Sequence, residues 1–394
     1  MMTGTITRPV ASRRGRLAVA GAFLVTMTGT TLPTPLYPLY AQRDGFGGVV
    51  VTVVFATYAV GVGTALVLTG GLSDRIGRRP VLAAGLAFSL LSGLVFLVPA
   101  EPALFVGRFL SGLSAGVFTG TATAALLDLS DEGGKARAGL VASVVTMTGL
   151  GTGPLVGGVL AQFAPWPLVL PYLVHAALLV LSAGALWTVP ETVSRGTFRI
   201  VPLRVGSVPP QARRVFVRAS TAGFAGFAVL GLLTGVSPQV MVEVLHRPEH
   251  VAVGLVVFAM GVGAAVGQVA STHLPERVVP VVGCAVLVVG TGLIGAGIGR
   301  ASLALFAAGA VVGGAGLGTT LRAGIVAVGG AAPERVRGAV VATFFLVLYT
   351  ALSLPVIGVG AAAHAVGMAT AGVVFSAIVG ALALLALVLS AREL

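Results

Sequence analysis

Long apolar stretches separated by short polar segments dominate the chain from residue 17 onward. Each approaches or exceeds the roughly 20 residues that an α-helix needs to cross the hydrocarbon core of a bilayer. They fall at residues 17–40, 47–71, 81–99, 102–126, 139–161, 168–189, 217–241, 251–272, 278–298, 302–326, 339–361 and 367–390. The pattern predicts an all-α integral membrane protein with twelve transmembrane helices.

The longest polar interruption divides these twelve stretches into six plus six. The halves also resemble each other at an offset of 200 residues, because Lys135 and Arg137 recur as Arg335 and Arg337 before an apolar run. Two such halves are expected to be pseudo-symmetric repeats. We therefore expect a first six-helix half at 1–192, a central cytoplasmic loop at 193–217 and a second six-helix half at 218–394.

Composition supports this fold class, since only 9% of the residues are charged and the mean hydropathy is +1.04. The net charge of +12 is unevenly placed. Nineteen Lys and Arg residues fall on the side that carries the N-terminus, against Arg43, Arg247 and Arg300 on the other. This bias predicts a multi-pass protein of the cell membrane with both termini in the cytoplasm. The basic excess then meets anionic lipid headgroups, and no nucleic-acid partner is needed to explain it.

Catalytic and metal chemistry have little support in the sequence. The basic start precedes an apolar run too long for a cleaved signal peptide, and Cys284, the single cysteine, excludes an internal disulfide. No cluster of His, Cys and carboxylate residues predicts a metal site or a catalytic group. We expect no cofactor, no enzymatic activity and a monomeric protein.

The segment 70–79, GGLSDRIGRR, follows the second apolar stretch. Gly77 permits a tight turn, and Pro80 is well placed to begin the next helix. Three arginines could serve only as a positive-inside anchor, but Asp74 beside a bilayer needs a partner. The segment is therefore a candidate functional motif.

These ten residues resemble the motif between the second and third helices of the major facilitator superfamily (Gly-x-Leu-Ala-Asp-Arg-x-Gly-Arg-Arg/Lys), with Ser73 in place of Ala. The resemblance implies a gating motif that holds the two halves together when the cavity faces outward. The residues that it assigns to this motif are Gly70, Asp74, Arg75, Gly77, Arg78 and Arg79, with Asp128 pairing with Arg78. In the second half the equivalent segment, 267–277, has Ser271 where the acid would stand.

Arg108 lies about seven residues into the fourth helix, roughly 10 Å from its outer end. A charge at that depth is costly unless it faces the bundle interior or a watery cavity. The run 104–116 resembles the fourth-helix motif of the family (Leu-xxx-Arg-xx-Gln-Gly), with Ser111 replacing Gln. The resemblance implies proton transfer or substrate binding for Arg108; the alternative is an arginine that reaches back to the membrane surface.

The fifth helix carries GLGTGPLVGG at 149–158. Gly149, Gly153 and Gly157 form a stripe of small residues, and Pro154 removes a backbone donor in mid-helix. Together with Gly158 they resemble the motif of the drug:proton antiporter branches of the superfamily. The resemblance favours export over uptake.

Other polar residues of the apolar stretches carry weaker expectations. Arg322 could either line the cavity or reach the surface, and His175 is expected to pack or to hydrogen-bond between helices. Tyr37 and Tyr40 suit an aromatic belt, although nearby prolines suggest an irregular helix end beside the cavity, which would place Tyr37 in the substrate or proton pathway. Gln239 and Glu243 are candidates for the cavity mouth.

The resemblance implies a cavity lined mainly by helices 1, 4, 7 and 10 and transport by alternating access. We expect proton-coupled export of a small hydrophobic or amphipathic compound. Uptake or export of a polar metabolite, such as a sugar, sugar alcohol or organic acid, remains an alternative. A receptor that does not transport is an alternative of another class.

Overall fold

The computed structural model describes residues 12–193 and 205–393. Within these ranges, twelve helical segments are long and apolar enough to cross a membrane. Their bounds are Arg13–Asp44, Gly48–Thr69, Arg78–Phe96, Glu101–Asp128, Glu132–Phe163, Leu170–Trp187, Pro210–Val244, His250–His273, Val279–Gly299, Leu303–Ala331, Glu334–Val366 and Met368–Ala391. The predicted fold class is confirmed.

Prolines interrupt two of these spans. The first consists of α1 (Arg13–Thr31), the short turn η1 (Thr34–Leu36) and α2 (Tyr37–Asp44), because Pro33 and Pro35 cannot donate a backbone N–H. The seventh begins as α9 (Pro210–Gly231) and then widens into π turns on both sides of the short α10 (Ser237–Gln239). Pro238 within α10 lacks the same donor. The irregular end predicted for the first helix is therefore present.

The remaining transmembrane helices are continuous. The first half adds α3 (Gly48–Thr69), α5 (Arg78–Phe96), α6 (Glu101–Asp128), α7 (Lys135–Phe163) and α8 (Leu170–Trp187). The second half adds α11 (His250–Ala270), α12 (Val279–Gly299), α13 (Leu303–Ala331), α14 (Arg337–Val366) and α15 (Met368–Ala391). α9 begins inside the segment 193–217 that the sequence predicts as a loop, since Pro210 is suited to a first helical turn.

The internal repeat is visible in the local structure. The short turn η2 (Glu132–Gly134) leads into α7, and the short turn η6 (Glu334–Val336) leads into α14. Each of these two long helices contains one internal proline, Pro154 or Pro355. The corresponding positions are about 200 residues apart, as the sequence repeat predicts.

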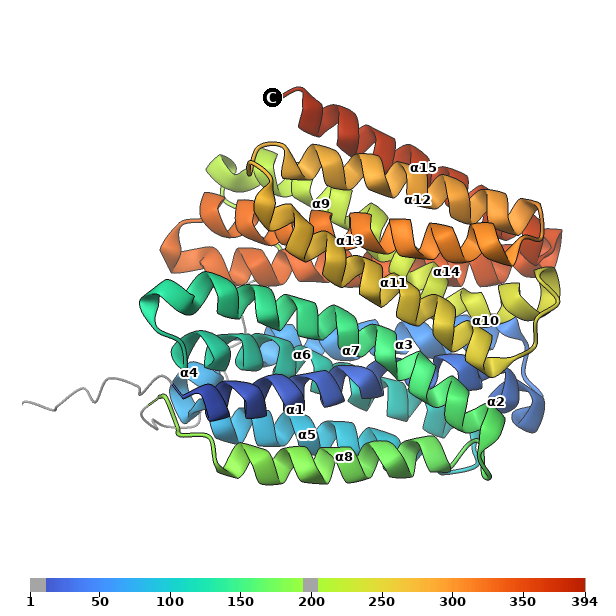
Figure 1. The fold of residues 1–394 in the computed structure, drawn as a ribbon, viewed down its shortest axis with the longest axis horizontal. Coiled ribbons are helices and arrows are strands. Elements are labelled where there is room, and N and C mark those ends of the chain that lie inside the picture. Colours follow the sequence, from blue (N-terminus) through green and yellow to red (C-terminus); the bar gives the residue numbers. More distant parts are fainter. Residues whose placement is uncertain (1–11, 194–204, 394) are drawn as a thin grey trace, which may run out of the picture.

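The helices run roughly parallel to one another, with the first half (blue to green) lying against the second (yellow to red) (Figure 1). α1 begins and α15 ends at the same end of the bundle, and the four-residue helix α4 (Ser73–Ile76) lies at this end beside the start of α1 (Figure 1). We call this end the basic end, because most described Lys and Arg residues lie there, and the opposite one the far end. Arg8 and the arginines at 195, 199 and 204 lie outside the described residues.

The halves meet along two helix pairs, α7 with α11 and α3 with α14. At the far end, the backbone N–H of Val251 donates to Oε1 of Gln162 at 3.0 Å, and Nδ1 of His250 lies 3.0 Å from the carbonyl oxygen of Pro35. Gly48 lies against the side chain of Gln239 across the same boundary. These contacts hold the halves together at the far end.

Candidate functional site: a cavity between the halves

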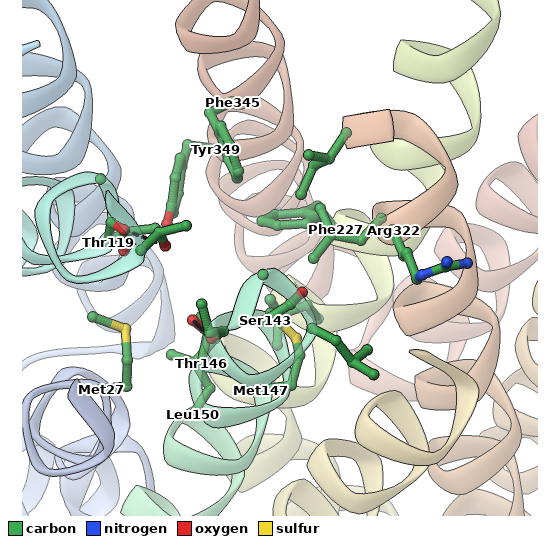
Figure 2. Close-up of a pocket in the computed structure, with 18 of the residues that line it drawn as sticks. Met27, Thr119, Ser143, Thr146, Met147, Leu150, Phe227, Arg322, Phe345 and Tyr349 are labelled. Atoms are coloured by element: carbon green, nitrogen blue, oxygen red, sulfur yellow. Dashed lines mark hydrogen bonds between the residues drawn. The ribbon is translucent and has the colours of Figure 1, made fainter. Parts of the chain in front are cut away.

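A cavity of about 830 Å³ lies between the halves. It reaches from Thr30 and Arg108 in the interior to Arg137 and Glu276 near the basic end. The first, fourth, seventh and tenth spans, which contain α1, α6, α9 and α13, contribute to it as the family resemblance implies. Helices α3, α7 and α14 line it as well. Figure 2 shows Met27, Thr119 and Leu150 of the first half opposite Phe227, Phe345 and Tyr349 of the second.

Aromatic rings from both halves close the inner part of this cavity. The ring of Tyr349 on α14 contacts Tyr58 on α3 and Phe227 on α9, with centroids 6.0 and 5.9 Å apart. Phe55 and Phe345 add further aromatic surface. Such edge-to-face contacts bury large apolar areas, so they join the halves while presenting ring faces to a bound molecule.

Arg108 lies at the inner end of the cavity and is 2% exposed. One Nη donates to the carbonyl oxygen of Thr30 at 2.5 Å, and the guanidinium lies over the Tyr58 and Phe55 rings at 4.7 and 5.3 Å. Thr30 is in the last turn of α1, where backbone carbonyls lack helical partners and carry partial negative charge. Arg108 therefore faces the bundle interior and does not reach back to the membrane surface.

The segment 70–79 forms a compact polar cluster at the basic end. Nη1 of Arg78 lies 2.5 Å from Oδ1 of Asp74, and its Nε lies 2.9 Å from Oδ2 of Asp128. Arg78 also donates to the hydroxyl of Ser73. The ion pair of Arg78 with Asp128 that the resemblance implies is therefore present. All these partners belong to the first half.

Glu191 is not among the predicted site residues, yet its carboxylate accepts hydrogen bonds from the backbone N–H groups of Arg78 and Arg79 at 2.7 and 3.1 Å. These groups belong to the first turn of α5, where the helix dipole favours an anion. Gly77 precedes them with a φ of 103°, and a side chain there would collide with Glu191. Glycine is thus required for both conformation and space.

The glycines of α7 pack against both halves. Added side chains at Gly149, Gly153 and Gly157 would collide with α1 or η1, whereas Gly151 and Gly158 contact α11. Small residues let the three helices approach closely. The motif at 149–158 thus places α7 between α1 and α11.

Pro154 has a specific effect within α7. It cannot donate to the carbonyl oxygen of Leu150, which is the usual helical acceptor four residues earlier. That oxygen instead accepts a hydrogen bond from the hydroxyl of Thr31 at 2.8 Å. The missing helical bond is therefore replaced by one between α7 and α1.

The weaker candidates are dispersed. Arg322 lines the cavity and donates to the carbonyl oxygen of Ser271 at 3.2 Å. His175 is 4% exposed, and its Nε2 lies 3.0 Å from the carbonyl oxygen of Val25, which fits the packing role. Glu243 is exposed, and neither it nor Gln239 lines the cavity. The assignment of these two to the mouth does not fit the structure, since the cavity extends toward the basic end and they lie at the far end.

The aromatic-belt interpretation of Tyr37 and Tyr40 is wrong. Both residues are at most 1% exposed. The Tyr40 hydroxyl hydrogen-bonds to that of Tyr172 at 2.8 Å, and the Tyr37 hydroxyl is buried without a described partner. The bend at η1 turns α2 so that both rings lie inside the first half.

Two cavity features were missed by sequence reasoning. Glu276 is the one carboxylate among the lining residues, and the aromatic group combines residues from three helices. Glu276 stands in a loop, and the sequence pattern there does not distinguish it from other surface acids. Among the described residues, no group of three or more His, Cys, Asp or Glu side chains could hold a metal ion.

The family model for the Major Facilitator Superfamily matches residues 19–347. The chain belongs to this superfamily. The family and the fold are those of a transporter that acts on small molecules.

Several curated bacterial members of the superfamily are similar to parts of the chain. Multidrug resistance protein MdtM of Salmonella typhimurium is 35% identical over 153 residues, covering 38% of this chain and 35% of that protein. Multidrug efflux protein YfmO of Bacillus subtilis is 29% identical over 163 residues, covering 41% and 40%. Multidrug transporter MdfA of Yersinia pestis is 31% identical over 183 residues, covering 45% and 44%. The chain thus spans less than half the length of these relatives.

A solved structure matches over nearly the full length. The bacterial homologue of the human lysosomal transporter Spinster, in an inward-facing and unoccupied conformation, superimposes with a TM-score of 0.72 and 16% identity. The match covers 97% of this chain and 99% of that one. At this identity it supports the major facilitator fold. With twelve spans in the described part, the protein is a multi-pass protein of the cell membrane.

Proposed function

We propose that this transporter exports small hydrophobic or amphipathic compounds from the cell by proton antiport. The cavity is the observation that carries the proposal. Its 830 Å³ is enough for a drug-sized molecule, and its wall combines aliphatic and aromatic side chains from both halves. The hydroxyls of its seven threonines all donate to backbone carbonyl oxygens. The multidrug names of the similar proteins support the same substrate class.

The proposed orientation places the basic end in the cytoplasm. The concentration of arginines at that end supports it through the positive-inside rule. In this orientation the cavity opens toward the cytoplasm, from which the cargo would enter. The Spinster homologue with the same fold is described as inward-facing.

Labelling of introduced cysteines tests this orientation. In a background in which buried Cys284 is replaced by alanine, Ser207→Cys and Arg392→Cys should react only with reagents applied from the cytoplasmic side. Arg300→Cys at the far end should react only from outside. Labelling of Ser207→Cys or Arg392→Cys from outside contradicts the proposed orientation.

Alternating access would require the far end to open while the basic end closes. The motif at 70–79 lies at the basic end, where it contacts only the first half among the partners described above. On closing, it would meet the second half and act as a gate. The packing of α7 supports this scheme, because this helix contacts α1 of the first half and α11 of the second half near the far end.

Proton coupling requires a group whose protonation differs between the two states. Arg108 stays protonated at physiological pH and cannot serve. The candidates are Asp74, Asp128, Glu243 and His175. Asp74 and Asp128 are favoured because both form ion pairs with Arg78 in this conformation, and closing of the basic end would rearrange these pairs.

Flux measurements in proteoliposomes test the coupling. A difference of one pH unit supplies about 1.4 kcal/mol per exchanged proton, which supports about tenfold accumulation of cargo. We expect this gradient to accelerate transport by the wild type, and the combined Asp74→Asn and Asp128→Asn variant to lose the acceleration. Wild-type flux that follows only the cargo gradient would indicate a facilitator instead.

A polar metabolite is a weaker candidate cargo. Sugars and sugar alcohols need several free hydrogen-bonding groups in their site, but the threonine hydroxyls of this cavity already donate to backbone carbonyl oxygens. A receptor that does not transport would show ligand binding without flux in the same proteoliposomes.

A further inference from the structure

Arg108 carries a charge that no acidic side chain in the described ranges balances. None of the ion pairs among the described residues includes it, although it is 98% buried. The end of α1 supplies only about half a unit of negative charge. The aromatic rings of Tyr58 and Phe55 add an attraction but no formal charge. A buried charge without a full counter-charge is expensive, so an anion beside Arg108 would be stabilised.

Arg108 also retains unused hydrogen-bonding capacity. Its Nε is buried and has no hydrogen-bond partner among the described residues. A guanidinium offers five N–H donors in a planar arrangement that suits a carboxylate. Because Arg108 lines the cavity, a cargo in the cavity can supply the missing acceptor.

The other charged groups of the cavity also favour the binding of an anion. Arg137 and Arg322 line it with Arg108, whereas Glu276 is the one acid among the lining residues and is exposed near the basic end. Three cations against one acid produce a positive potential, which attracts anions and opposes cations. The apolar wall around Phe227 and Phe345 requires that such an anion also carry a large apolar body.

We propose that the cargo is an amphipathic organic anion, with an aromatic or branched apolar body in the cavity and a carboxylate-type group beside Arg108. The proposal rests on the proposed export function and names its substrate class. An uncharged analogue can still accept a hydrogen bond from Arg108 but leaves the charge unbalanced. An amine of the same shape is opposed by the field of all three arginines.

Three fluorescent probes of the same shape test this preference on the purified full-length protein: pyrenebutyrate, its primary amide and pyrenebutylamine. Binding is measured by fluorescence titration and by thermal stabilisation. We expect the carboxylate to bind about tenfold more tightly than the amide, as one charge-assisted hydrogen bond would give, and the amine to bind most weakly. Equal binding of the carboxylate and the amide, or preference for the amine, overturns the proposal.

Variants assign the preference to one residue. Arg108→Gln should reduce the ratio of carboxylate to amide affinity to about one, and Arg108→Lys should retain much of it. Arg300→Gln, which removes an exposed arginine at the far end, should leave the ratio unchanged. The ratio is informative even if Arg108→Gln weakens binding of all probes, because a purely structural role would weaken the carboxylate and the amide alike. An unchanged ratio in Arg108→Gln overturns the proposal.

Proteoliposome flux separates this inference from the proposed function. If the carboxylate binds preferentially but is not transported, the inference about the cavity stands and export is wrong. If the amide or the amine is exported as well as the carboxylate, export stands and the anion preference is wrong. If none of the probes binds, the anion preference is also wrong.

Discussion

Gly158→Val should abolish transport while the protein still inserts into the membrane. Gly158 lies on α7, and an added Cβ would collide with the backbone of His250 and Val251 on the second half. Backbone atoms cannot move aside as the end of a flexible side chain can. Overpacking of this kind costs about 1–3 kcal/mol, which shifts a two-state population by about 5–150-fold. The cost falls on the conformation closed at the far end, so the cavity should become accessible from outside.

The matched control for this substitution is in the other repeat. Gly358 stands 200 residues further along on α14, and an added Cβ there would meet nothing within 4 Å. Gly358→Val should therefore retain transport. The two variants are compared by their transport rates in proteoliposomes and by the labelling, from outside, of a cysteine introduced into the cavity. Normal flux in Gly158→Val would show that the α7–α11 contact at this position is not needed for the cycle.

Asp74→Asn should reduce transport at least about tenfold and leave the stability of the protein nearly unchanged. The Asp74 side chain is 64% exposed, so its pair with Arg78 contributes no more than about 1 kcal/mol in the present conformation. Its expected importance belongs to the opposite state, in which closure of the basic end removes water from the motif. A difference of a few kcal/mol between two states is enough to hold the transporter in one of them.

Asp128→Asn provides the contrast. The Asp128 side chain is 31% exposed and also accepts a hydrogen bond from the hydroxyl of Thr192, so this residue holds three segments of the first half together. Its neutralisation leaves the buried Arg78 with one charged partner, the exposed Asp74, beside the hydroxyl of Ser73. We expect a measurable loss of thermal stability for Asp128→Asn and almost none for Asp74→Asn. If Asp74→Asn transports as fast as the wild type, the motif serves only as a membrane anchor.

The transmembrane spans could be predicted because a bilayer imposes its length on every crossing. Each apolar run had to be about 20 residues long, and hydropathy alone therefore located the helices to within several residues. Helix ends were less predictable. α9 extends back to Pro210, because a helix can project beyond the apolar core when polar residues such as Gln211, Arg213 and Arg214 cover its end. α13 continues to Ala331, beyond the predicted boundary.

The pair of Arg78 with Asp128 could also be predicted, because the resemblance of the segment 70–79 to the family motif implies it. The contact of Glu191 could not. It lies 113 positions from Arg78 along the chain, and only the packing of the first half brings it to the start of α5. The spacing of residues along the sequence does not predict a contact between two segments that are separated by several helices and loops.

The sequence by itself determined the number of spans, the internal repeat and the concentration of arginines at one end. These features depend on local hydropathy and charge, which are properties of neighbouring residues. Tertiary structure decided that Tyr37 and Tyr40 are buried and that α7 contacts both halves. It also decided that Arg108 faces a cavity and forms no ion pair with an acid in the described part of the chain. In lipid every face of a helix can be apolar, so periodicity does not show which face meets another helix, the cavity or the bilayer.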